Sequence, residues 1–170
     1  MMLVAVSAFV ALATPTALSA ALAGAATPTS FTLTAGALTI SAPTTSVSLG
    51  SEVASANQTT MSGQLGNVTV TDQRGGTTTW TASVISTAFT PTAGPADPAS
   101  NVSYAAGAIT DSATVVATAV NASDLTGVAT IATGASTGIS SATWDPTITV
   151  IVPADFAPGL YAATITSSVA

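Results

Sequence analysis

Apolar residues alternate with threonine and serine at a spacing of two along most of this chain. Residues 31–35 (FTLTA) show the alternation clearly, and Gly36 separates them from a second apolar pair, Leu38 and Ile40. Successive side chains of a β-strand point to opposite faces, so this spacing predicts half-buried strands rather than helices. The glycine predicts a β-bulge between the two halves of the segment.

Further segments predict strands in the same way. Residues 68–71 (VTVT) alternate strictly, and residues 79–84 have an apolar face opposed by hydroxyl side chains. Residues 113–120 are apolar on both faces, which is expected of a central strand. Residues 147–152 and 160–169 alternate again, and the loop between them, rich in Pro and Gly, predicts that they pair as a hairpin.

The abundance of Thr, Val and Ser also argues against helices, because these residues lose side-chain freedom on a helix or compete with its backbone bonds. Many short strands bury one face each most economically in two packed sheets, so the predicted fold class is all-β, a two-sheet β-sandwich of immunoglobulin-like type. The main rival, a β-solenoid, requires a fixed repeat period, and none is found. Residues 91–100 (PTAGPADPAS) are expected to cross between the sheets.

The N-terminal segment has the pattern of a secretory signal. An uncharged apolar run, residues 3–13, is followed by small residues with Ala-x-Ala sites at residues 21–23 and 23–25. We therefore predict a signal peptide over residues 1–26 and a single β-sandwich domain over residues 27–170. The alternative is an uncleaved N-terminal membrane anchor, which would be the only contact with a membrane.

Composition narrows the location and the partners. Charged residues are 5% of the 170 residues, compared with about 25% in ordinary soluble domains. Thr and Ser take their place, which favours an exported protein. The net charge is −6, so nucleic acid is excluded as a partner by repulsion. The chain has no Cys, so its stability must come from packing rather than from disulfides.

One turn carries the sharpest local signal. Asp72 and Arg74 are followed by Gly75 and Gly76 and then by Trp80, so two strands and a turn are predicted, and Arg74 is the only basic residue in the chain. In a structural role, Arg74 would fork onto Asp72 and pin the hairpin. In a functional role, it would bind a carboxylate or phosphate of a ligand.

The two tryptophans, Trp80 and Trp144, lie on or beside predicted strands and are interpreted as core anchors. Sugar-binding proteins stack aromatic rings on their ligands, and Trp144 precedes Asp145 and Pro146 at the entrance of a strand. Trp144 is therefore the better candidate of the two for a ligand-binding ring.

Most catalytic and metal chemistries are excluded. The chain has no His, Cys or Lys, so Ser-His, Cys-His and Ser-Lys nucleophile systems and zinc sites of Cys or His are impossible. The seven acidic residues show no paired spacing, although a carboxylate pair that hydrolyses a glycoside remains an alternative. Calcium binding in loops by Asp97, Asp111 or Asp124 also stays open, and no cofactor is expected.

The combined residues resemble a known family. Val70-x-Asp72-x-Arg74-Gly75 leads to Trp80, and Trp144 is followed by residues 148–153 and by Gly159-x-Tyr161-x-x-x-Ile165. From about Phe31 to Ala170 this is similar to the WxL-domain group of Gram-positive surface proteins and its actinobacterial relatives. Both tryptophans, however, lack the Leu of the Trp-x-Leu motif, a departure that bears on wall affinity more than on the fold.

The resemblance implies an exported β-rich domain that attaches noncovalently to the cell wall through peptidoglycan. It marks Asp72, Arg74, Trp80, Trp144 and Tyr161 as candidate ligand-binding or structural residues. The expected function is thus noncatalytic wall binding, with glycan or peptide stems as partners. The alternatives are a structural subunit or adhesin that assembles with other surface proteins, and a glycoside hydrolase.

Overall fold

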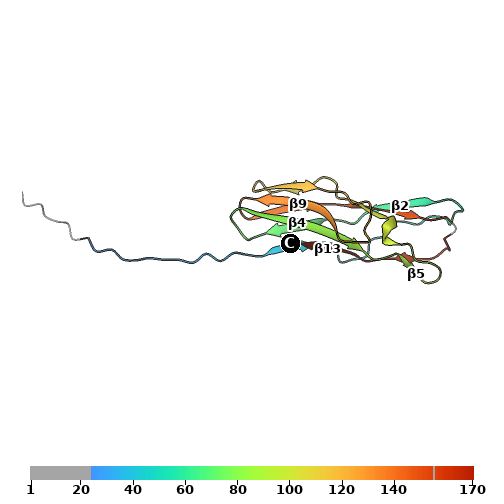
Figure 1. Cartoon of the computed structure of the whole chain (residues 1–170), viewed down its shortest axis with the longest axis horizontal. Helices are drawn as coiled ribbons and strands as arrows, with labels where there is room; N and C mark the ends of the chain where they lie inside the picture. The colour runs from blue at the N-terminus through green and yellow to red at the C-terminus, as the bar shows by residue number, and fades with distance from the viewer. Residues whose placement is uncertain (1–23, 155) are drawn as a thin grey trace, which may run out of the picture. The chain divides into compact units, whose positions relative to one another are not determined.

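The structure is a computed structural model that describes residues 24–154 and 156–170. The predicted signal peptide falls mostly on residues 1–23, outside the described residues. Residues 24–33 contain no helix or strand, whereas Thr34–Ala170 form one compact unit. This unit carries all the strands described below (Figure 1).

The described residues are nearly all β, which confirms the predicted fold class. The strands in chain order are β1 (Leu38–Ser41), β2 (Thr59–Gln64), β3 (Val68–Asp72), β4 (Thr78–Ser86), β5 (Thr90–Pro91), β6 (Val102–Ala105), β7 (Thr110–Asp111), β8 (Val115–Ala119), β9 (Ala129–Ser136), β10 (Ser140–Trp144), β11 (Thr147–Val152), β12 (Tyr161–Ala162) and β13 (Ile165–Val169). One short 3-10 helix, η1 (Ala99–Asn101), precedes β6.

The first layer of the sandwich is built from two antiparallel ladders in line. One has the order β1-β3-β10-β7 and the other β2-β11-β6. Three connections join the two ladders: β2 is followed in sequence by β3, β6 by β7, and β10 by β11. At the interruption, Leu65 N donates to Pro146 O at 2.9 Å and Gly66 N donates to an Asp145 carboxylate oxygen at 3.0 Å.

The second layer has the order β13-β4-β9-β8 and is continued by the short pair β12-β5. Figure 1 shows β4, β9 and β13 together, with β5 and β2 toward the far end of the unit. Buried residues from both layers meet in one core, and they include Val68, Val70, Trp80, Ala82, Val84, Tyr104, Leu125, Ile131, Trp144 and Ile148. The predicted two-sheet sandwich is therefore the observed arrangement.

Two predicted hairpins are wrong. β3 and β4 flank the Asp72–Arg74 turn, but β3 pairs with β1 and β10, whereas β4 pairs with β13 and β9. Likewise β11 pairs with β2 and β6, while β13 pairs with β4. In both cases the connection carries the chain from one layer to the other. The apolar faces of the two strands therefore meet across the core instead of lying on one face of one sheet.

One further local prediction is wrong, and one is supported by the structure. Residues 31–35 form no strand, and the first strand begins at Leu38. The bulge predicted at Gly36 is supported by the hydrogen bonds: Gly36 N donates to Gln73 O and Gln73 N donates to Ala37 O, each at 2.9 Å, so two residues oppose one just before β1. A Cβ on Gly36 would lie 2.7 Å from Gln73 O, so the backbones also approach closely there. A further register shift lies within β4, between Ala82 and Ser83.

The segment predicted as a central strand is an edge strand. It forms β8, which has β9 as its only ladder partner among the described strands. Val115 faces the core, but Val116 is 74% exposed. The crossing between layers predicted for residues 91–100 is confirmed, because this segment joins β5 of the second layer to η1 and β6 of the first.

Candidate functional site

The Asp72–Arg74 turn is a closed hydrogen-bonded cluster at one end of the sandwich. The Asp72 carboxylate is enclosed and accepts hydrogen bonds from Arg74 Nε at 2.9 Å and from Arg74 Nη2 and Thr78 Oγ1, each at 2.8 Å. Arg74 N also donates to it at 3.0 Å, and Arg74 Nη2 donates to Thr79 O at 2.8 Å. The carboxylate is thus occupied by four donors of its own turn.

Electrostatics agrees with this structural role. The hydrogen bonds from Arg74 hold the pKa of Asp72 well below its usual range, and they outweigh the opposing effect of burial. The side chain of Arg74 is 32% exposed, so the pair is only partly shielded from solvent. Gly75 and Gly76 have φ values of 70° and 69°, a left-handed conformation that glycine adopts without strain.

Both tryptophans are core residues, which removes Trp144 as a sugar-stacking candidate. Trp144 is 2% exposed, and its Nε1 donates to the Tyr104 hydroxyl at 2.8 Å. Burial raises the pKa of Tyr104 to about 12. Trp80 is 3% exposed and lies in register with Gly134 of β9. Neither ring presents a face to a ligand, because each fills space between the layers.

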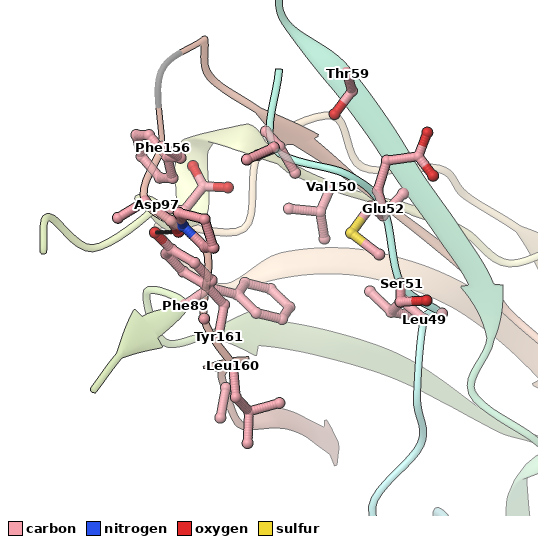
Figure 2. Close-up of a pocket in the computed structure, with 18 of the residues that line it drawn as sticks. Leu49, Ser51, Glu52, Thr59, Phe89, Asp97, Val150, Phe156, Leu160 and Tyr161 are labelled. Carbon is pink, nitrogen blue, oxygen red and sulfur yellow. Dashed lines mark hydrogen bonds between the residues drawn. The ribbon is translucent and has the colours of Figure 1, made fainter. Parts of the chain in front are cut away.

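A cleft of about 760 Å³ opens at the opposite end of the sandwich, between the β2–β11 ladder and the β12–β5 pair (Figure 2). Its sides are residues 46–57, which run beside β2 without forming a strand, and the Pro- and Gly-containing loop before β12. Its apolar lining includes Leu49, Met61, Phe89, Val150, Val152, Phe156, Leu160 and Tyr161, and its polar lining includes Ser51, Glu52, Asn57, Thr59 and Asp97.

Two aromatic rings form one wall of the cleft. Tyr161 and Phe156 are stacked, with ring centroids 5.7 Å apart and an angle of 20° between the ring planes. The Tyr161 hydroxyl donates to Ala157 O at 3.0 Å, which holds the loop against the ring. Both rings are partly exposed. Of the five residues marked by the family resemblance, Tyr161 is therefore the one that lines this cleft.

Asp97 lies on the same side of the cleft as Phe156 and Tyr161, whereas Glu52 lies across from it (Figure 2). The backbone of Asp97 forms a two-bond bridge with Phe89, at 2.8 and 2.9 Å. Its side chain accepts a hydrogen bond from Asn101 Nδ2 at 2.6 Å. Asp97 is 2% exposed, and this burial raises the pKa of its carboxyl group.

Calcium ligands do not converge in the described residues. Asp111 of β7 accepts a hydrogen bond from Ala117 N of β8 at 3.0 Å, and Asp124 accepts one from Thr126 N within its own turn at 2.8 Å. No group of three acidic side chains that could hold a metal ion occurs in residues 24–154 and 156–170. Asp97 lines the cleft, whereas Asp111 and Asp124 do not.

Sequence reasoning missed Phe89 and Phe156 as cleft residues and considered Asp97 only as a calcium ligand. The available signal was weak: Phe89 and Phe156 lie next to proline-containing loops, away from the alternating segments. Their meeting depends on which strands pair. Phe89 precedes β5, and β5 pairs with β12, which brings Phe89 to the same end as Tyr161.

The sequence matches no protein-family model, and neither the curated proteins nor the solved structures contain a match to it. None of the described residues belongs to a helix long and apolar enough to cross a membrane. The geometry of the cleft is therefore the basis on which a function is assigned.

Proposed function

We propose that this chain is a noncatalytic exported module that binds the peptidoglycan of the bacterial cell wall through the cleft beside Tyr161. The observation that carries the proposal is the partly exposed, stacked pair of Tyr161 and Phe156 in a cleft of about 760 Å³. Ligand sites are typically clefts of about 300–1,000 Å³ with an apolar and aromatic lining and a few polar groups. The cleft has this size and lining.

Charge is compatible with the neutral and zwitterionic parts of a wall polymer. The net charge of −6 opposes nucleic acids and anionic polymers. The cleft contains the acidic Glu52 and Asp97 and no basic side chain among its lining residues. Glycan and peptide stems offer hydroxyl, amide and amino groups that suit such a surface, and aromatic rings provide flat apolar faces for them.

The test is sedimentation of the chain from Thr27 onward with purified peptidoglycan. We expect the wild type to pellet with the polymer and Tyr161→Ala to bind at least about tenfold more weakly, as for the loss of a central aromatic contact. Leu160→Ala and Ile139→Ala are a matched pair of variants, because both residues are apolar and exposed, at 79% and 67%. Only Leu160 lines the cleft, so we expect Leu160→Ala to weaken binding and Ile139→Ala to bind like the wild type. Recovery of the wild type in the supernatant would overturn wall binding, and equal binding by Tyr161→Ala would overturn the cleft.

One observation favours the second candidate, assembly with other surface proteins. The outer edge of β2 has no ladder partner among the described strands. Residues 46–57 run beside this edge, and Leu49 approaches Gly63 so closely that a Cβ there would lie 3.1 Å from its Cδ2. They nevertheless form no backbone hydrogen bonds with it. Unpaired edges are templates for strand addition.

Sedimentation velocity separates the two candidates. Wall binding predicts a monomer that pellets only with peptidoglycan, whereas a structural subunit self-associates without it. Incubation of the protein with purified peptidoglycan also tests the hydrolase alternative. Release of soluble reducing sugars from the polymer would show turnover and overturn a noncatalytic role.

A further inference from the structure

The wall of the cleft contains a buried carboxylate, that of Asp97, of which only one oxygen accepts a hydrogen bond. Asp97 Oδ1 accepts from Asn101 Nδ2, but Oδ2 accepts no hydrogen bond from the described residues. Among these residues, no fully enclosed side-chain oxygen or nitrogen lacks a partner. The unpaired Oδ2 therefore keeps a slight exposure, and Asp97 is one of the residues that line the cleft.

This chain has no cation of its own to pair with Asp97. Arg74 is its one basic side chain and is bound to Asp72 and Thr79 in the turn between β3 and β4. A buried carboxylate loses hydration, and the loss is costly unless a positive group or several hydrogen bonds compensate for it. The raised pKa of Asp97 is the sign that this compensation is incomplete in the free protein.

The surroundings of Asp97 select the kind of cation. Phe89 is bridged to its backbone, and Phe156 and Tyr161 lie on the same side of the cleft. Such a lining suits an alkyl chain that ends in a compact charged group, and aromatic faces add a cation–π attraction. An ammonium group offers three donors, of which one can meet Asp97 Oδ2 while the others remain hydrated or reach neighbouring oxygens.

We propose that Asp97 binds the side-chain ammonium group of the diamino acid in peptidoglycan stem peptides, with the alkyl part of that side chain against Phe89 and Tyr161. This inference rests on the proposed wall-binding function and names the part of the polymer that the cleft recognises. Electrostatic pairing with a desolvated carboxylate supplies the specificity for stems whose amine is free.

The test compares native peptidoglycan with the same polymer after acetylation of its amines. We expect the wild type to bind the acetylated polymer about 10- to 100-fold more weakly, as for the loss of a hydrogen bond between charged groups. Asp97→Asn, which keeps the shape and an oxygen for Asn101, is expected to lose affinity for native polymer to the same extent. The variant should bind the two polymers equally.

Asp124→Asn is the matched control, because it removes the same charge from an exposed turn outside the cleft. It should bind like the wild type. Soluble stem peptides locate the amine: a stem with the diamino acid should bind, and one with alanine at that position should bind about 10- to 100-fold more weakly. Equal binding of these two stems would overturn the inference.

The outcomes also separate the two proposals. Equal binding of native and acetylated polymer by the wild type overturns the ammonium inference and leaves wall binding in place. Sensitivity to acetylation that Asp97→Asn does not remove overturns the assignment to Asp97. Failure to bind either polymer overturns the proposed function itself. The acetylation result uses the wild type alone, so it holds even if Asp97→Asn does not fold.

Discussion

Arg74 closes a turn at the end of the sandwich remote from the cleft. Its guanidinium group meets both carboxylate oxygens of Asp72 and one backbone carbonyl, that of Thr79. A fork of this kind fixes direction as well as distance, because the guanidinium group is planar and its donors are rigid. The turn joins the two layers, so its geometry sets how β4 leaves β3.

Arg74→Ala is expected to lower the melting temperature by several degrees. The substitution leaves the enclosed Asp72 carboxylate with Thr78 and a backbone N–H as its remaining donors, and an uncompensated buried charge destabilises a fold. Arg74→Lys keeps the charge without the planar fork and should recover part of the loss. Thermal unfolding followed by circular dichroism at pH 7 measures all three proteins.

Acid supplies the second readout of this prediction. The pKa of Asp72 is lowered in the folded state, so the stabilisation by the pair is complete above the ordinary aspartate pKa of about 3.9 and declines as the pH falls below it. The difference in stability between wild type and Arg74→Ala should narrow over that acid range. An unchanged melt together with lost wall binding would instead assign Arg74 to a ligand.

Sequence reasoning succeeded for side chains whose role is local. The fork between Arg74 and Asp72 spans two residues, and Trp80 lies on an alternating segment whose apolar face is buried. It failed for Asp97, which was considered only as a calcium ligand. Whether a carboxylate is buried depends on which segments the fold brings beside it, and here a backbone bridge joins Asp97 to Phe89.

The second layer contains a close fit between an aromatic ring and a glycine of the neighbouring strand. Trp80 of β4 and Gly134 of β9 are directly opposite in register. A Cβ placed on Gly134 would overlap the Trp80 indole. The ring therefore covers the glycine of the neighbouring strand, an arrangement that pins register and fills the space that a side chain would otherwise occupy.

Gly134→Ala is expected to destabilise the protein by about 1–3 kcal/mol, because the added methyl group displaces a packed ring. Urea unfolding followed by circular dichroism measures the change, and tryptophan fluorescence should report a shift in the surroundings of Trp80. Gly127→Ala is the control, since a Cβ at Gly127 meets nothing within 4 Å. Equal stability of the two variants would contradict the packing described for Trp80.

The alternating segments predicted strands well but predicted their partners poorly. The expected hairpins at β3–β4 and β11–β13 are instead connections between layers. Alternation states that one face of a strand is buried, and it is the same whether the neighbouring strand lies beside it or across the core. Residues 31–35 alternate as well, but they have no partner strand and form no strand in the structure. Alternation therefore does not by itself produce a strand.

The two ends of the folded unit differ in how firmly their backbone is held. At the turn end, β3 lies between β1 and β10 and is bonded on both sides. At the cleft end, residues 42–58 form no backbone–backbone hydrogen bonds with other described residues. Two of their N–H groups are bound by serine hydroxyls, at Gly50 and Asn57. The cleft is thus bordered by a segment held mainly by packing.

Hydrogen exchange should reveal this difference. We expect amides of residues 42–58 to exchange with an opening free energy near zero, whereas those of β3, β4 and β10 approach the global free energy of unfolding. Mass spectrometry of peptic fragments resolves the two classes. Uniform slow exchange across residues 42–58 would contradict the absence of backbone partners, and slowing of exchange there by peptidoglycan fragments would agree with binding in the cleft.

Alternation and the wealth of hydroxyl residues were sufficient to determine the all-β class and the two-layer sandwich, and the lack of Cys, His and Lys excludes the nucleophile systems and zinc sites that need those side chains. These properties follow from each residue's own preference and from its immediate neighbours. Long-range pairing determined the rest. The cleft exists because β5 pairs with β12 and β2 with β11, which brings Phe89, Asp97 and Tyr161 to one end of the fold.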